Sequence, residues 1–133
     1  MKSYAKINIG LNILNKRDDG YHNIETIFIP IDVYDTIEVS SSDSIVIESN
    51  IDWLANNENI CYKVAKYLLE KHDIKKGVRI TLNKQIPIGA GLGGGSSNAA
   101  ILLKMLNSLY NLNLPYDKQK EIALLFGSDV PFF

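Results

Sequence analysis

The beginning of the chain alternates between apolar and polar side chains. Apolar residues occupy every second position, at Ala5, Ile7, Ile9, Leu11 and Ile13. This period of two predicts a β-strand with one face buried in the core. Lys6 and Asn8 fall between the apolar positions, so we expect them to lie side by side on the opposite face, directed away from the core.

The rest of the pattern predicts a mixture of strands and helices. A turn is predicted at residues 16–20, and further strands at 24–31, 36–39, 45–47 and 78–82. Helical spacing of apolar residues favours helices at about 59–72, 96–110 and 117–126. A glycine-rich loop, residues 88–95, precedes the second helix. This succession predicts one α+β domain, residues 1–133, with a mostly antiparallel sheet packed against helices.

Composition and charge narrow the classes of function. The chain has 133 residues, 46% of them hydrophobic, which suffices for one buried core. Its formal net charge of -1 provides no positive field to hold a nucleic acid, so any phosphate recognition has to be local. No signal core and no apolar run of membrane-spanning length is found, so we expect a cytoplasmic protein with no membrane partner. The single cysteine, Cys61, is expected to be a small core residue.

The strongest local feature is the segment PIGAGLGGGSSNAA at residues 87–100. Its glycines permit positive φ and a close approach of the backbone to a ligand, and Ser96 or Ser97 is expected to cap the following helix. The N-terminus of that helix presents unpaired N–H groups and a partial positive charge, which suit a phosphate. Each hydrogen bond to a charged phosphate oxygen contributes roughly 1.5–3 kcal/mol, so a few of them could hold a triphosphate without a nearby lysine.

The residues of this loop also allow other known glycine-rich motifs to be tested. It is not a Walker A loop, because no Gly-Lys-Ser/Thr closes it. Gly89, Gly91 and Gly94 satisfy the dinucleotide pattern G-x-G-x-x-G, but residues 111–114 lack the acidic residue that this pattern requires about twenty positions later. A tight turn alone would not require five glycines among residues 89–95.

The glycine segment resembles the central motif of the GHMP kinases. Three shorter segments agree with that family: AKIN at residues 5–8, RDDGYH at 17–22 and GSDVPF at 127–132. Together they are similar to the branch that phosphorylates 4-diphosphocytidyl-2-C-methyl-D-erythritol, and DGYH at 19–22 is the part that argues for this substrate. The resemblance covers the whole chain. It implies the two-layer, ribosomal-protein-like fold of a GHMP kinase N-terminal domain, with the ATP cleft between the glycine loop and the helices.

The resemblance also implies a reaction and residue roles. The reaction is transfer of a phosphoryl group from ATP, with Mg²⁺, to the 2-hydroxyl of the cytidine diphosphate-linked methylerythritol in the non-mevalonate isoprenoid pathway. Asp129 matches the catalytic aspartate, Lys6 the lysine beside it, and Asn8 a contact to the sugar alcohol. Tyr21 and His22 match the residues that stack on and hydrogen-bond to the cytosine. The implied ATP site consists of Pro87, Gly89, Gly91, Leu92, Gly93, Gly94, Gly95, Ser96, Ser97 and Asn98, with Asn59 and Lys84 near the adenine.

Elementary chemistry agrees with these roles. Phosphoryl transfer has a loose transition state, so positioning and charge neutralisation matter more than removal of the hydroxyl proton. A Lys6 ammonium beside Asp129 should keep the carboxylate ionised, as an acceptor that aims the hydroxyl, and can offset charge on the transferring group. Tyr21 offers a flat face for a pyrimidine and His22 a polar edge. No cluster of residues has metal-ligand spacing, so Mg²⁺ is expected to arrive with the nucleotide.

Alternatives stay open for several of these residues. Lys6 could be an ordinary solvated strand residue, Asp129 could be a residue that ends a helix, and Tyr21 and His22 could merely flank a turn. At the level of function, the alternatives are another GHMP small-molecule kinase, or a non-catalytic binding module on the same fold.

Two phenylalanines, Phe132 and Phe133, stand at the end of the chain with no predicted element to pack against. Unpartnered, they would leave large apolar surface in water, so we expect a missing C-terminal domain. The resemblance implies that such a domain supplies part of the substrate pocket. Residues 1–133 by themselves are therefore expected to turn over little or no substrate.

Overall fold

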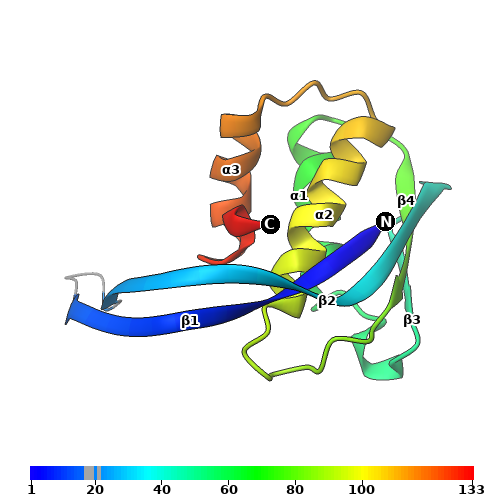
Figure 1. The fold of residues 1–133 in the computed structure, drawn as a ribbon. Helices are drawn as coiled ribbons and strands as arrows, with labels where there is room; N and C mark the ends of the chain where they lie inside the picture. Colours follow the sequence, from blue (N-terminus) through cyan, green and yellow to red (C-terminus); the bar gives the residue numbers. More distant parts are fainter. Residues whose placement is uncertain (17–19, 21) are drawn as a thin grey trace.

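The computed structural model describes residues 1–16, 20 and 22–133, and three helices in it pack on one face of a four-stranded sheet (Figure 1). The strands are β1 (Lys2–Lys16), β2 (His22–Ser42), β3 (Val46–Ser49) and β4 (Gly77–Asn83), in the spatial order β1-β2-β4-β3. β1 and β4 both pair antiparallel with β2, while β3 runs parallel to β4. The predicted α+β class with a mostly antiparallel sheet is confirmed.

β2 is one long strand where the pattern predicted two. Tyr4 pairs with Tyr34 but Ala5 pairs with Ile31, so β2 has two additional residues between these pairs. They form a bulge, which interrupts the alternation of side chains without ending the strand. The prediction of separate strands at 24–31 and 36–39 was therefore wrong, because a bulge and a turn interrupt the hydrophobic pattern alike.

The helices lie close to their predicted positions. They are α1 (Ile60–Lys71), α2 (Gly94–Leu109) and α3 (Tyr116–Leu124), with short 3₁₀ turns η1 (Asp52–Leu54) and η2 (Val130–Phe132). The core lies between sheet and helices and contains the buried residues Ile37, Ile80, Leu82, Val64, Leu68, Leu102 and Leu106. Cys61 is fully buried in the same core, as predicted. Among the described residues, no helix has both the length and the apolar character needed to cross a membrane.

The predicted burial of one whole face of β1 is wrong. Ala5 is fully buried, but Ile9 and Ile13 are 51% and 65% exposed. Figure 1 shows the reason, because the far ends of β1 and β2 extend beyond the helices as a two-stranded arm. A strand buries its apolar face only where a second layer covers it. The alternation was correct for a strand, but the described residues provide no layer over its distal half.

The two final phenylalanines have partners, contrary to expectation. The rings of Phe132 and Phe28 of β2 lie 4.9 Å apart, centre to centre. Phe133 is partly buried and packs against the core. The turn η2 brings both rings back onto the domain, which the hydrophobic pattern of the sequence could not reveal.

Candidate functional site

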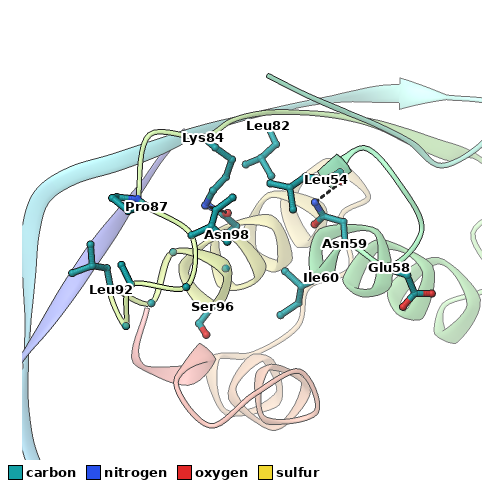
Figure 2. A pocket seen from close by; sticks show the side chains of 17 residues that line it. Leu54, Glu58, Asn59, Ile60, Leu82, Lys84, Pro87, Leu92, Ser96 and Asn98 are labelled. Atoms are coloured by element: carbon teal, nitrogen blue, oxygen red, sulfur yellow. Dashed lines mark hydrogen bonds between the residues drawn. The ribbon is translucent and has the colours of Figure 1, made fainter. Parts of the chain in front are cut away.

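The glycine loop borders a cavity of about 440 Å³ between the starts of α1 and α2 (Figure 2). Such a volume lies within the usual range for small-molecule sites. The lining consists of Leu54, Glu58, Asn59, Ile60, Leu82, Lys84, residues 87–96 and Asn98. Every residue predicted for the ATP site therefore lines the cavity, except Ser97.

α2 begins at the loop itself, and neither serine caps it. Gly93 is the N-cap residue, with φ 70°, and no side chain makes a capping hydrogen bond. The prediction of Ser96 or Ser97 as the cap was wrong, because the left-handed conformation of Gly93 starts the helix before the serines are reached. Ser97 is instead fully buried, and its Oγ accepts a hydrogen bond from the hydroxyl of Ser3 at 2.8 Å. The first N–H groups of α2, which have no partner within the helix, lie at the cavity wall.

Close packing explains two of the glycines. A Cβ added to Gly93 would lie 2.9 Å from Cζ of Phe133 and 3.0 Å from Cγ of Lys6. At Gly94 it would lie 3.0 Å from Cγ2 of Ile86 and 3.2 Å from Nζ of Lys84. A Cβ at Gly95 would meet nothing within 4 Å, although this residue also lines the cavity. Packing therefore does not require glycine at position 95, and the lack of a side chain there is compatible with close approach of a phosphate to the start of α2.

A buried polar network that the sequence did not predict lies beneath the loop. Asp35 of β2 is fully buried and accepts a hydrogen bond from the ammonium of Lys84. The Nδ2 group of Asn98 donates to Asp35 and to Oγ of Ser3, at 2.9 Å each. Lys84 Nζ also donates to Oδ1 of Asn98 at 3.0 Å. Asp35 and Ser3 were missed because nothing in a local pattern distinguishes a buried acid or hydroxyl from an exposed one.

Asn59 has a structural role at the cavity rim. Its Oδ1 accepts from the N–H of Cys61 at 2.9 Å and so caps α1, while its Nδ2 donates to the carbonyl of Leu54 at 2.8 Å (Figure 2). Beside it, Glu58 accepts a hydrogen bond from Lys63 at 2.8 Å, which holds the pKa of the Glu58 carboxyl below its usual value. Residues that line the cavity thus also stabilise the start of α1.

Lys6, Asn8 and Asp129 form a cluster next to the loop. The ammonium of Lys6 donates to Oδ1 of Asn8 at 2.6 Å and lies 3.5 Å from Oδ2 of Asp129. The Lys6 side chain is 7% exposed and that of Asp129 36%, so the carboxylate stays accessible from solvent. The ring of Phe28 lies 4.8 Å from the ammonium and limits its freedom further. Asn8 and Lys6 lie side by side as predicted, but Lys6 is buried.

One backbone hydrogen bond joins this cluster to the cavity. The N–H of Lys6 donates to the carbonyl of Leu92, in the glycine loop, at 2.9 Å. Gly93 then packs directly against the Lys6 side chain. The ion pair and the loop are therefore neighbours, so a group bound to the loop can approach the ion pair.

Two predicted site residues lie outside this description. Tyr21 and the side chain of His22 are not among the described parts of the chain, so their predicted roles with the cytosine stay predictions. Among residues 1–16, 20 and 22–133, no three or more His, Cys, Asp or Glu side chains lie close enough together to hold a metal ion.

Comparison with known proteins points to one family. The family model described as GHMP kinases N terminal domain matches residues 59–133. The 4-diphosphocytidyl-2-C-methyl-D-erythritol kinases of Chlorobium chlorochromatii and Chlorobium phaeobacteroides are 49% and 51% identical to the chain. These alignments cover 99% and 100% of this chain, but 46% and 47% of those proteins.

A solved structure agrees with these relatives. The crystal structure of a 4-(cytidine 5'-diphospho)-2C-methyl-D-erythritol kinase superposes with a TM-score of 0.84 at 39% identity. It is matched over 100% of this chain and 47% of that one. The chain thus spans a little under half the length of the relatives that it matches.

Proposed function

The chain belongs to the GHMP kinase family, and we propose that the intact protein transfers the terminal phosphoryl group of ATP to the 2-hydroxyl of 4-diphosphocytidyl-2-C-methyl-D-erythritol. The similarity to kinases of that name supports the choice of substrate. The observation that carries the proposal is the Lys6–Asp129 pair, 3.5 Å apart and hydrogen-bonded through the Lys6 backbone to the glycine loop.

The loop and the start of α2 are proposed to bind the phosphates. Their support is the cavity of about 440 Å³, the free N–H groups at the start of α2, and the open space at Gly95. We propose that Mg²⁺ binds together with the nucleotide phosphates, which are its usual ligands in enzymes that transfer phosphoryl groups. When bound, it would neutralise phosphate charge.

Asp129 and Lys6 are proposed to act on the acceptor hydroxyl. The Asp129 carboxylate can accept a hydrogen bond from the hydroxyl and so aim its oxygen along the line of transfer. The Lys6 ammonium, held by Asn8 and Phe28, would offset negative charge on the transferring group. Because the transition state is loose, this alignment contributes more than a strong base would.

Replacing Asp129 by Asn tests the proposal in the intact protein. The amide keeps the size of the side chain but removes its negative charge and its ability to take up the hydroxyl proton, so kcat should fall by roughly 10²–10⁴ if proton transfer contributes, with modest change in ATP affinity. Asp43→Asn, at an exposed bend, is the matched control and should keep wild-type turnover. Wild-type turnover in the Asp129 variant would remove this carboxylate from the mechanism.

The identity of the acceptor needs a separate experiment, because Tyr21 and the side chain of His22 lie outside the described structure. A bound cytidine nucleotide should raise the melting temperature of the intact protein, since any ligand that prefers the folded state stabilises it. Protection by ATP alone would point to another GHMP kinase. Failure of ATP analogues to bind would instead favour a non-catalytic module.

A further inference from the structure

Asp35 is a buried carboxylate whose two oxygens each accept two hydrogen bonds. It is fully buried, and its Oδ1 accepts from the backbone N–H groups of Gln85 at 2.7 Å and Ile86 at 2.9 Å. Its Oδ2 accepts from Nδ2 of Asn98 at 2.9 Å and from the ammonium of Lys84. Both oxygens are therefore satisfied, as a buried charge requires.

The donors to Asp35 come from both sides of the glycine loop. Gln85 and Ile86 immediately precede it, and Asn98 lies in the first turns of α2, just after it. One carboxylate on β2 therefore ties together the two ends of the loop that lines the cavity. Hydrogen bonds to an ionised acceptor are stronger than neutral ones, so these ties restrict the loop more than ordinary backbone bonds would.

Lys84 connects this network to the cavity. It lines the cavity wall, and its ammonium lies 3.2 Å from the point where a Cβ on Gly94 would be. The same ammonium donates to Asp35 and Asn98, so the network fixes its position (Figure 2 shows Lys84 and Asn98 together). Without Asp35, Lys84 would be a buried cation without its counter-ion.

We propose that Asp35 is a positioning residue for the nucleotide. It does not line the cavity itself, and it acts by holding Lys84 and the two ends of the loop, through the amides of Gln85 and Ile86 and the side chain of Asn98, in the arrangement that receives the phosphates. The inference rests on the proposed kinase function. Asp35 lies in none of the motifs that the chain shares with the family. The inference predicts a specific effect, on ATP rather than on the acceptor alcohol.

The experiment is Asp35→Asn in the intact protein, assayed with ATP and the cytidine-linked acceptor. The amide has one acceptor oxygen instead of two, and its NH₂ group would face donors. The KM for ATP should rise roughly tenfold or more, while the KM for the acceptor stays unchanged. A merely structural role would reduce the fraction of active enzyme, and so kcat, without changing either KM.

Two controls separate positioning from loss of stability. Asp73→Asn changes an exposed carboxylate in the same way and should leave both KM values at wild type. Leu106→Ala destabilises the core far from the cavity lining and should lower the melting temperature without raising the KM for ATP. An Asp35 variant that behaves like Leu106→Ala would overturn the inference.

If the single variant does not fold, Asp35→Asn combined with Lys84→Met removes the unpaired ammonium. Compared with Lys84→Met alone, the double variant should still show a roughly tenfold higher KM for ATP, because the amides of Gln85 and Ile86, which anchor the start of the loop, have lost their charged acceptor. Equal values would refute the role of Asp35. Wild-type protein that fails to bind ATP would reject the kinase proposal and this inference together, whereas wild-type binding with an unchanged variant would reject this inference alone.

Discussion

Lys6 and Cys61 show how burial changes the chemistry of single residues. The Lys6 side chain is 7% exposed, yet its ammonium has Asn8, Asp129 and the Phe28 ring as partners. These contacts compensate for the lost hydration of the ammonium and fix its position. Cys61 has no such compensation, because it is surrounded by the core, and burial raises the pKa of its thiol to about 12.

The pKa of Cys61 makes a prediction for alkaline stability. The folded chain keeps a proton that the unfolded chain, with a thiol pKa of 9.0, releases. The contribution of the thiol is therefore complete below pH 9 and is lost as pH rises toward about 12, by about 1.4 kcal/mol per pH unit. Between about pH 8 and pH 10.5, the free energy of unfolding of the wild type should fall about 2 kcal/mol more than that of Cys61→Ala.

Urea unfolding of both proteins at the two pH values measures this difference. The alanine variant serves as the reference, since all other titrating groups are shared. A gap between the two proteins that does not change with pH would show that the thiol is not held protonated by the fold.

At the scale of elements, the glycine loop and the start of α2 act as one unit. Gly93 caps the helix in a left-handed conformation, Lys6 binds the loop through Leu92, and Asp35 binds both of its ends. A loop this rich in glycine would lose much entropy on ordering if it were free. Its ties to β1 and β2 mean that this cost is met during folding rather than when a ligand binds.

Alanine at Gly93 should reduce stability, whereas alanine at Gly95 should reduce nucleotide affinity. Gly93→Ala places a Cβ 2.9 Å from Phe133 on a residue with φ 70°, so it should destabilise the protein by roughly 1–2 kcal/mol or more. Gly95→Ala meets no atom within 4 Å and improves helix propensity, so the melting temperature should not fall. Gly95 lines the cavity, however, so if the loop binds the phosphates as proposed, an added methyl group should reduce affinity for an ATP analogue roughly tenfold or more.

Thermal unfolding and calorimetric titration of the intact protein distinguish the two glycines. A Gly95 variant with wild-type nucleotide affinity would mean that the ligand does not approach this part of α2. A Gly93 variant with wild-type stability would mean that the loop can relax away from Lys6 and Phe133.

At the scale of the whole molecule, the chain divides into a packed body and an arm. The body joins β4, β3 and the near part of β2 to the helices, while the far ends of β1 and β2 extend beyond them (Figure 1). Ile13 and Ile27 on the arm are 65% and 63% exposed, whereas Ile37 in the body is fully buried. Isoleucine therefore contributes to the hydrophobic core in the body, but not in the arm.

Threonine substitutions in the 133-residue chain test this division. Ile37→Thr removes buried apolar volume and buries a hydroxyl, so it should cost about 2–4 kcal/mol of unfolding free energy. Ile13→Thr keeps a β-branched residue at an exposed position and should change stability by less than about 0.5 kcal/mol. Denaturant unfolding measures both. A comparable loss at Ile13 would show that the arm is covered in solution.

The sequence by itself determined the features that depend on near neighbours. The helices at α1, α2 and α3 follow from apolar spacing, and the glycine loop follows from a composition that only close backbone approach requires. The resemblance of short motifs, rather than any spacing, brought Lys6 and Asp129 together before the fold was known. The helices and the glycine loop are local features, so the chain specifies them without reference to distant partners.

Outside the family motifs, tertiary structure alone decided which distant residues meet. Asp35 and Asn98 are 63 positions apart, yet one hydrogen bond joins them beneath the loop. The bulge in β2, the contact of Phe132 with Phe28, and the exposure of Ile13 likewise depend on register and on where the helices stop covering the sheet. Hydrophobic period reports which side of an element a residue occupies, but only packing determines whether another layer covers that side.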